Sequence, residues 1–290
     1  MHRIFKRRSL LYVPGSSQKA LQKAATLTEV DSILFDLEDS VAPESKGAAR
    51  HQTADAIRSS APREGGKEIA VRVNPPASPF YVDDLLAMVP LRPETLILPK
   101  ASARDVICMD GLLSSLELRH GLPVGGIGLI PLVETAEGVM DIVGIIRASG
   151  RVSGVALGGE DLTSDLEIKR TDAGEELRWS RNCLAMACRA ASVDCIDTPY
   201  GNFKDTAGFE VDTAYAKSIG MTGRSLIHPS QIEAANKLFS PTMEEAEYAA
   251  RVVAAYEEAL NNRLGAIALD GKMIDVPIYE RAKKLLADLA

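Results

Sequence analysis

The stretch IGLIPLVETAEGVMDIVGIIRA, residues 127–148, joins an apolar run to an amphipathic segment. The run Ile127–Val133 predicts a strand that is covered on both faces. Glu134 follows it directly, and Thr135 is a residue type that begins helices. Four apolar residues then recur with helical spacing, namely Val139, Ile142, Val143 and Ile146. The stretch therefore predicts one strand followed by one helix over residues 135–148.

The same unit recurs along the chain. Seven further apolar runs predict strands at Leu10–Val13, Ser32–Phe35, Ile69–Val73, Thr95–Leu98, Ser153–Leu157, Val193–Ile196 and Ser225–Ile227. Helical patterns lie between or after them, at 16–27, 45–59, 102–119, 175–191, 206–219 and 230–238. Strands that alternate with helices, without hairpin signals, indicate a parallel sheet. Eight such units need about 250 residues, so the 290-residue chain predicts an α/β fold, a (β/α)8 TIM barrel over residues 1–240.

Residues 241–290 lie outside the eight units and predict a C-terminal helical extension. We expect helices over 241–262 and 278–289, joined by a link of small residues at 264–271. The final helix carries an apolar stripe, which consists of Ile278, Ala282, Leu285, Leu286 and Leu289. Such a stripe needs a partner surface, either the barrel of the same chain or a neighbouring subunit. We expect the neighbouring subunit.

Composition narrows the class of protein. A net charge of −7 argues against nucleic-acid binding, which depends on basic surface. The basic N-terminus, Arg3, Lys6, Arg7 and Arg8, is either a solvated tail or a segment near an anionic ligand. No apolar run is long enough to span a membrane, and the N-terminus lacks the apolar centre of a signal peptide. Four cysteines without a CxxC pair are typical of a reduced, cytoplasmic protein.

Charged residues stand at the ends of nearly all the predicted strands. They are Asp36 with Glu38 and Asp39, Arg72, Lys100, Glu134, Glu160 with Asp161, Asp197, and His228. In a (β/α)8 barrel the C-terminal ends of the strands meet on one face, and this face carries the chemistry. We therefore expect one active site built from these residues.

Glu134 and Asp161 end consecutive predicted strands and are expected to hold a metal ion. Neighbouring parallel strands lie about 4.8 Å apart, so two such carboxylates can reach one ion. Oxygen ligands favour Mg²⁺, and none of the four histidines has the spacing of a zinc site. The alternatives are a first-turn glutamate that suits the helix dipole, and an aspartate that caps a helix.

The other charged residues leave alternatives open. Asp36, Glu38 and Asp39 form a solvated loop, a second layer around the waters of the metal, or a partner for Arg72. Arg72 lies within an apolar strand. Its role there is either that of a buried ion-pair partner or that of a bidentate clamp for a carboxylate. Lys100 is either a salt-bridged lysine or a Schiff-base nucleophile.

Several motifs resemble those of one known family. They are SLLYVPG (9–15), FDLEDSV (35–41), VRVN (71–74), LPK (98–100), PLVET (131–135), GEDL (159–162), IHPSQI (227–232) and MIDVP (273–277). In this order, they resemble the citrate lyase β-subunit-like family. That family lies within the HpcH/HpaI aldolase superfamily, together with malyl-CoA and citramalyl-CoA lyases. The resemblance implies a (β/α)8 barrel, Mg²⁺ dependence and a homotrimer or hexamer.

The resemblance also implies roles at matching positions. Glu134 and Asp161 would hold Mg²⁺. Arg72 would bind the carboxylate of a 2-oxo acid, helped by backbone N–H groups around Gly159 and Glu160. The acyl-CoA thioester would contact Tyr12, Lys19, Lys23, Ile227 and His228.

The implied reaction cleaves a 3-hydroxyacyl-CoA to a 2-oxo acid and acetyl-CoA, with Arg72 and Asp275 as catalytic residues. A neighbouring subunit would supply Asp275 to protonate the enolate, whereas a purely structural Asp275 would cap the last helix. Reverse synthesis and thioester hydrolysis are related activities of such a site. The rivals are a partner-dependent β subunit of a citrate lyase complex, acting on an acyl-carrier-protein thioester, and a Schiff-base aldolase that uses Lys100.

Overall fold

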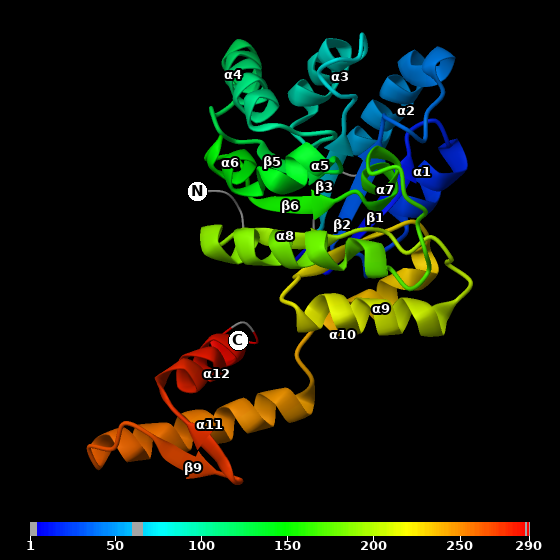
Figure 1. The fold of residues 1–290 in the computed structure, drawn as a ribbon. Helices are drawn as coiled ribbons and strands as arrows, with labels where there is room; N and C mark the ends of the chain where they lie inside the picture. The colour runs from blue at the N-terminus through cyan, green and yellow to red at the C-terminus, as the bar shows by residue number, and fades with distance from the viewer. Residues whose placement is uncertain (1–4, 60–65, 288, 290) are drawn as a thin grey trace. The chain divides into compact units, whose positions relative to one another are not determined.

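The computed structural model describes residues 5–59, 66–287 and 289. The chain forms two compact units, Met1–Phe239 and Ser240–Ala290. The first unit is a barrel surrounded by helices, and the second contains two helices and a small hairpin (Figure 1). Among the described helices, none combines the length and the apolar character that crossing a membrane requires.

The barrel is a closed sheet of eight parallel strands in chain order. The strands are β1 (Ser9–Pro14), β2 (Ser32–Asp36), β3 (Glu68–Arg72), β4 (Thr95–Leu98), β5 (Gly128–Val133), β6 (Gly154–Leu157), β7 (Asp194–Asp197) and β8 (Gly223–Leu226). Strand β1 pairs with β2 on one side and with β8 on the other, which closes the sheet. The predicted (β/α)8 barrel is confirmed, and every predicted apolar run overlaps one strand.

Apolar side chains from the strands fill the inside of the barrel. They are Leu10, Leu34, Ala70, Ile97, Ile130, Leu132, Ala156 and Ile196, and all of them are buried. Tyr12 packs against this cluster. Because the interior is solid, a ligand can reach the barrel only at its ends.

Helices follow the strands and cover the outside of the barrel (Figure 1). They are α1 (Gln18–Ala25), α2 (Lys46–Ser59), α3 (Tyr81–Met88), α4 (Ala103–Arg119), α5 (Ala136–Met140), α6 (Ile142–Arg147), α7 (Gly159–Asp165), α8 (Arg178–Ala191), α9 (Thr206–Ser218) and α10 (Ile232–Phe239). Short 3₁₀ turns occur at Pro43–Ser45, Val89–Leu91, Glu175–Leu177 and Pro229–Gln231. Helices α3 and α7 were not expected from the sequence.

The single helix predicted over residues 135–148 is wrong, because the chain breaks at Asp141 into α5 and α6. Asp141 leaves the helical conformation, with φ −113° and ψ 22°. Its carboxylate fills the space that a Cβ on Gly144 would need. The break also turns Val143 outward, where it is 46% exposed instead of buried on the predicted face. Thr135 does begin α5 as expected, accepting from the Gly138 N–H at 3.0 Å.

The N-terminal end of the barrel is closed by a buried ion pair. Arg7 contacts Glu68 at 2.7 Å, and Ser32 donates to the same carboxylate at 2.6 Å. Arg8 pairs with Asp31 at 2.8 Å. Arg7 and Arg8 are therefore neither part of a solvated tail nor placed near an anionic ligand, because each of these two arginines forms a structural ion pair. Lys6 is exposed, and Arg3 lies outside the described residues.

The second unit contains α11 (Met243–Asn261), a hairpin of β9 (Ile267–Leu269) and β10 (Lys272–Ile274), and α12 (Val276–Ala287). The expected link at 264–271 is wrong, because residues 267–274 form this hairpin around the tight turn Asp270-Gly271. Both turn residues have positive φ, and Asp-Gly is a strong hairpin signal that the sequence analysis missed.

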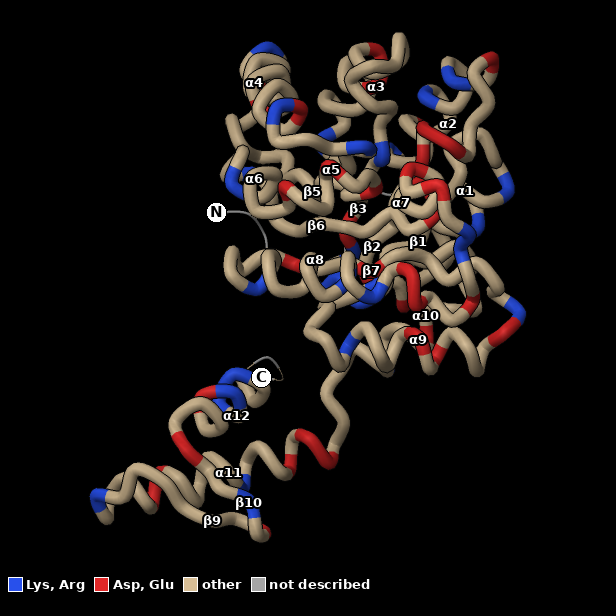
Figure 2. The backbone as a smooth tube through the Cα atoms, in the orientation of Figure 1, with Lys and Arg blue, Asp and Glu red and all other residues tan. Residues whose placement is uncertain are grey.

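The apolar stripe of the last helix packs within its own unit. Its core comprises Ala249, Val252, Tyr256, Ile274, Tyr279 and Ala282. Tyr256 and Tyr279 stack with ring centroids 4.9 Å apart. Ile278, Leu285 and Leu286 pack against the same core. The stripe therefore has a partner surface that the sequence analysis did not consider, namely helix α11 and the hairpin. Figure 2 shows that both units carry Lys or Arg residues and Asp or Glu residues, distributed irregularly along the chain.

Candidate active site

A cavity of about 430 Å³ opens at the C-terminal end of the barrel. It is lined by Tyr12, Pro14, Asp36, Asp39, Ser40, Arg72, Leu132, Glu134, Leu157, Gly158, Gly159, Glu160, Asp161, Thr198, Pro199 and Ile227. Most of the charged residues predicted at strand ends meet here, as the geometry of a parallel barrel requires.

Arg72 is held in place by acids at the end of β2 and in the loop that follows it. Its Nε and Nη2 donate to the two carboxylate oxygens of Asp36, at 2.7 and 2.8 Å. Its Nη1 lies 2.9 Å from Glu38 and 3.4 Å from Asp39. The guanidinium also lies over the ring of Tyr12, 5.0 Å from its centroid. Of the three alternatives for the acidic loop, the structure therefore favours a partner for Arg72.

The two inner acids of this loop respond to Arg72 differently. Burial would raise the pKa of Asp36, but the hydrogen bonds and charge of Arg72 outweigh it and hold the pKa below its usual value. Burial also acts on Glu38, with Asp39 beside it, and raises the pKa of Glu38 to about 7 despite Arg72. Asp36, which lines the cavity, is thus firmly ionised, whereas Glu38, which contacts Arg72 but does not line the cavity, can take up a proton near neutral pH.

Glu134 extends from the end of β5 into the cavity and is only 3% exposed. Burial, with the negative charge of Asp161 nearby, raises the pKa of Glu134 to about 8. The backbone N–H of Lys100 donates to Glu134 at 2.7 Å and opposes this shift. Gly158 makes room for the carboxylate, because a Cβ at that position would collide with the Glu134 side chain. The carboxylate therefore lies in a place that suits a negative charge only when a cation is near.

Asp161 lies in the first turn of α7, and the residue that caps this helix is Gly158. The N-cap alternative for Asp161 is therefore wrong. Its Oδ2 atom is buried and has no hydrogen-bond donor. The nearest positive charge is Lys100 Nζ, at 3.4 Å. A buried carboxylate oxygen without a donor fits the coordination of a hard cation.

Lys100 spans two acids and sits in a left-handed backbone conformation, with φ 50°. Its Nζ is 3.3 Å from Glu38 and 3.4 Å from Asp161. Burial would lower the pKa of Lys100, but the charges of these two carboxylates outweigh it and raise the pKa. The structure therefore favours the salt-bridged alternative.

A divalent cation fits the residues present. In the ranges that the structure covers, no group of three or more His, Cys, Asp or Glu forms a closed metal cage. Mg²⁺ needs no such cage, because it binds through one or two carboxylates and keeps waters or substrate oxygens for its other positions. Glu134 and Asp161 provide such a pair, with one raised pKa and one oxygen that lacks a donor.

Several predicted site residues do not line the cavity. Lys19 and Lys23 are exposed on α1. His228 is exposed and stacks on Phe203, with centroids 4.7 Å apart. Tyr12, which the resemblance groups with the two lysines, does line the cavity and points into the barrel beneath Arg72. Asp275 belongs to the second unit, where it precedes α12 and lies 3.4 Å from the Ile278 N–H.

Other residues of the cavity were missed by the sequence analysis. Thr198 directly follows β7, so the rule that singled out Asp197 could have included it. Leu132 and Leu157 are ordinary strand residues, and Ser40 and Pro199 are loop residues without charge, so none gave a signal. Asp197 itself is fully buried and pairs with Arg181 at 3.0 Å. The Gly159 N–H, expected to contact substrate, donates to Thr198 at 2.9 Å instead.

A (β/α)8 barrel whose C-terminal face gathers an arginine and a cluster of acids is the framework of an enzyme. The chain belongs to the HpcH/HpaI aldolase/citrate lyase family, whose sequence profile matches residues 8–229.

Relatives over the full length have several activities. Citrate lyase subunit beta of Haemophilus influenzae is 39% identical over 97% of this chain and 96% of its own length. A (3S)-malyl-CoA thioesterase of Cereibacter sphaeroides is 33% identical over 97% of this chain and 93% of its own length. The CitE protein of Mycobacterium tuberculosis, solved in complex with magnesium, acetoacetate and coenzyme A, is 29% identical, with 97% of each chain covered and a TM-score of 0.79.

Proposed function

We propose that the chain is a Mg²⁺-dependent carbon–carbon lyase that cleaves a 3-hydroxyacyl-CoA to a 2-oxo acid and acetyl-CoA. The observation that carries the proposal is one cavity that contains the anchored Arg72 and two neighbouring carboxylates. Of these, Glu134 has a raised pKa, and Asp161 has a buried oxygen without a hydrogen-bond donor. Substrates of the citramalyl-CoA, malyl-CoA and citryl-CoA type have a carboxylate and a hydroxyl on one carbon. These two groups match an arginine and a metal ion side by side.

In this proposal Glu134 and Asp161 hold Mg²⁺. When bound, the ion supplies Lewis-acid stabilisation of negative charge on the substrate oxygens. The hydroxyl gives its proton to solvent water, its O–H electron pair forms the carbonyl, and the carbon–carbon bond breaks; the products are the 2-oxo acid and a thioester enolate. Protonation of the enolate then gives the acetyl thioester.

Arg72 orients the substrate carboxylate. Asp36 occupies the Nε–Nη2 edge and fixes the plane of the guanidinium. The other edge of the guanidinium, between Nη1 and Nη2, faces the substrate carboxylate in this proposal. There the substrate competes with Glu38, which lies 2.9 Å from Nη1. Because burial and Asp39 already raise the pKa of Glu38 to about 7, protonation of Glu38 would release Arg72 for the incoming carboxylate.

Asp275 is the proposed proton donor, supplied by a neighbouring subunit. The Asp275→Asn variant should still fold and bind Mg²⁺, but its turnover should fall by about 10²–10⁴-fold. If Asp275 only caps α12, the variant would lose about 1 kcal/mol of stability and keep its activity.

Mixed assemblies test whether Asp275 crosses between subunits. Asp275→Asn subunits combined with Arg72→Ala subunits should regain partial activity, because some sites would have both groups intact. Verified mixing without recovery would mean that Asp275 serves its own barrel or only caps the helix. The homotrimer or hexamer and the cytoplasmic location remain predictions from the sequence.

The experiment that tests the main proposal is a coupled assay of the purified protein with citramalyl-, malyl-, methylmalyl- and citryl-CoA. Each thioester is assayed with Mg²⁺ and with excess EDTA. We expect cleavage of at least one of them, and only with Mg²⁺. Full turnover in EDTA would overturn the metal's role. Release of free acid and CoA without carbon–carbon cleavage would indicate a thioesterase.

A second candidate is the β subunit of a citrate lyase complex, which acts on an acyl-carrier-protein thioester. The similarity to citrate lyase subunit beta of Haemophilus influenzae over nearly the full length of both chains favours it. The same assay separates the two candidates. A partner-dependent β subunit would leave all four CoA thioesters intact and would cleave a citryl group on an acyl carrier protein.

The Schiff-base alternative has less support. A nucleophilic lysine must be neutral, and the two carboxylates beside Lys100 favour the charged ammonium. We therefore expect borohydride to trap no adduct between Lys100 and a 2-oxo acid.

A further inference from the structure

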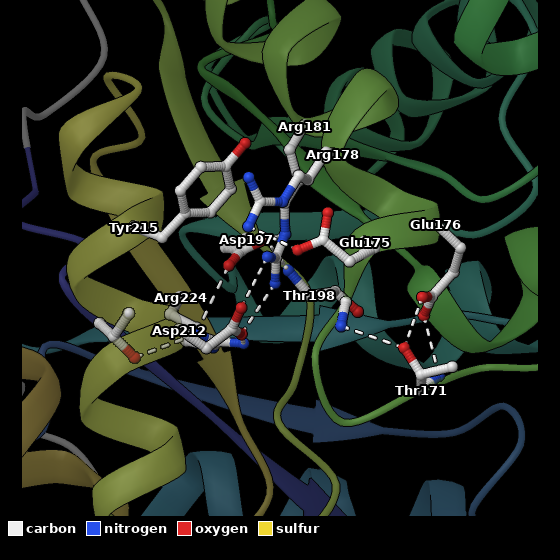
Figure 3. A network of polar contacts seen from close by, with 12 residues as sticks. Thr171, Glu175, Glu176, Arg178, Arg181, Asp197, Thr198, Asp212, Tyr215 and Arg224 are labelled. Carbon is white, nitrogen blue, oxygen red and sulfur yellow. Dashed lines mark hydrogen bonds and ion pairs between the residues drawn. The ribbon is translucent and has the colours of Figure 1, made fainter.

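The end of β7 is held by a buried network of four charged side chains (Figure 3). Arg181 donates to Asp197 at 3.0 Å and to both oxygens of Asp212, at 2.7 and 2.9 Å. Arg224, from β8, bonds to Asp212 and lies 3.6 Å from Asp197. All four residues are at most 9% exposed. Two positive and two negative charges balance within the network, so Asp197 is locked between α8, α9 and β8.

Thr198 connects this network to the cavity. Its backbone N–H donates to Asp197 at 2.9 Å, and its hydroxyl oxygen accepts from the Gly159 N–H at 2.9 Å. Thr198 is 1% exposed and lines the cavity. A continuous set of contacts therefore leads from Arg181 through Asp197 and Thr198 to the first residue of α7.

The start of α7 has little freedom at this contact. A Cβ on Gly159 would lie 2.7 Å from the Thr198 hydroxyl and 2.7 Å from Leu177 Cδ1. The backbone of Gly159 therefore packs directly against Thr198. Asp161 lies two residues further along the same turn of helix. The position of the Asp161 carboxylate depends on where this turn is held.

We propose that Thr198 is a positioning residue: its hydroxyl oxygen holds the Gly159 amide and thereby keeps Asp161 beside Glu134 for binding a divalent cation. Thr198 acts through α7 and is not a metal ligand. The inference rests on the proposed function, because it takes Asp161 as a ligand of Mg²⁺.

The test compares Thr198→Val, which keeps the shape but loses the acceptor, with Thr198→Ser, which keeps the acceptor. In Thr198→Val we expect the affinity for Mg²⁺, measured by calorimetry, to fall by about 10–100-fold, as for other residues that orient metal ligands. The Gly159 amide should exchange its hydrogen faster. Saturating Mg²⁺ should restore most of kcat. Thr198→Ser should match the wild type in all three measurements.

Thr95→Val is the matched control. Thr95 is also 1% exposed, but it lies on β4 and donates its hydroxyl to Glu68 at the other end of the barrel. Thr95→Val should lower thermal stability and leave the affinity for Mg²⁺ unchanged. If Thr198→Val does not fold, Thr198→Ala removes the same acceptor without adding bulk.

Two outcomes would overturn the inference: wild-type Mg²⁺ affinity in Thr198→Val, or equal losses in Thr198→Ser and Thr198→Val. Asp161→Asn separates this failure from that of the proposed function. If Asp161→Asn loses Mg²⁺ binding while Thr198→Val keeps it, only the inference fails. If Asp161→Asn itself keeps full Mg²⁺ affinity, the metal site of the proposed function fails as well.

Discussion

The two ends of the barrel treat buried carboxylates in opposite ways. At the N-terminal end, burial would raise the pKa of Glu68, but Arg7, Ser32 and Thr95 outweigh it and hold the pKa below its usual value. At the C-terminal end, Glu134 receives one backbone hydrogen bond, and burial with Asp161 nearby raises its pKa to about 8. Both residues are almost completely buried. Their pKa values shift in opposite directions because Glu68 has a cationic partner and several hydrogen-bond donors, whereas Glu134 has a second carboxylate beside it.

This contrast shows which end of the molecule serves stability and which serves function. Every oxygen of Glu68 is matched by donors, as expected where a side chain has only to hold strands together. Glu134 has one hydrogen bond and a raised pKa, so its burial costs stability in the metal-free protein, and such a cost is typical of a site that awaits a ligand.

The largest expected effect is on stability, at the N-terminal end. Glu68→Gln would leave Arg7 as a buried cation without its main partner, so the free energy of unfolding should fall by about 3–5 kcal/mol. Urea denaturation measures the loss. The residual folded protein should keep its affinity for Mg²⁺. A variant as stable as the wild type would contradict the structural role of this end.

Glu134→Gln should have the opposite profile. Turnover should fall by about 10²–10³-fold, equivalent to about 3–4 kcal/mol, because a metal ligand is lost. Unfolding of the metal-free variant at neutral pH should require at least as much urea as the wild type, since glutamine does not have to take up a proton on folding, as the buried Glu134 does. Asp161→Asn serves as a second test of the same ion. Full activity in either variant would refute the metal site.

The third prediction concerns pH. Between pH 4.5 and about 8 the folded protein keeps the proton of Glu134, whereas the unfolded chain has lost it. The free energy of unfolding of the metal-free protein should therefore fall as pH rises, with Glu134 contributing at most about 1.4 kcal/mol per unit. Glu38, with a pKa of about 7, adds to this trend.

Glu68 has the opposite sign, which makes it the internal control. Because its folded pKa is lowered, its stabilisation is complete above pH 4.5 and is lost as pH falls through the folded pKa. Urea unfolding in EDTA at a series of pH values should show that Glu134→Gln flattens the curve between pH 4.5 and about 8 and leaves the part below pH 4.5 unchanged. A flattening below pH 4.5 instead would reverse the assignment of the two ends.

The smallest effect is expected for Arg72→Lys. The variant keeps the charge but loses the fork, so the affinity for a 2-oxo acid should fall at least about tenfold, or about 1.4 kcal/mol. Calorimetry with oxaloacetate or pyruvate measures it. Lysine also loses the two-point contact with Asp36, so a matched Asp36→Asn variant shows how much of the effect comes from anchoring. Unchanged binding in Arg72→Lys would reject the clamp.

The barrel could be predicted because each strand is a short apolar run buried on both faces. The break at Asp141 could not, because the apolar spacing continues across it from Val139 to Ile146. The hairpin at 267–274 was missed because its strands are only three residues long.

Part of the cavity could be predicted for a geometric reason: parallel strands bring Arg72, Glu134 and Asp161 to one end of the barrel. The partners of these residues could not. The pairing of Asp36 with Arg72 depends on the register between β2 and β3, which aligns the two residues. Thr198 is uncharged, and its role depends on contact with Gly159, which is distant in sequence.

The closed order of the strands also has a consequence for folding. The proposed site draws on side chains from the ends of β2, β3, β5 and β6, and on Thr198 after β7. No contiguous fragment shorter than residues 36–198 contains them all, and β1 must still pair with β8. Because such long-range pairings form slowly, the ability to bind Mg²⁺ should appear late during refolding, after the helical circular dichroism signal. Binding of the ion would then report the moment at which the barrel closes.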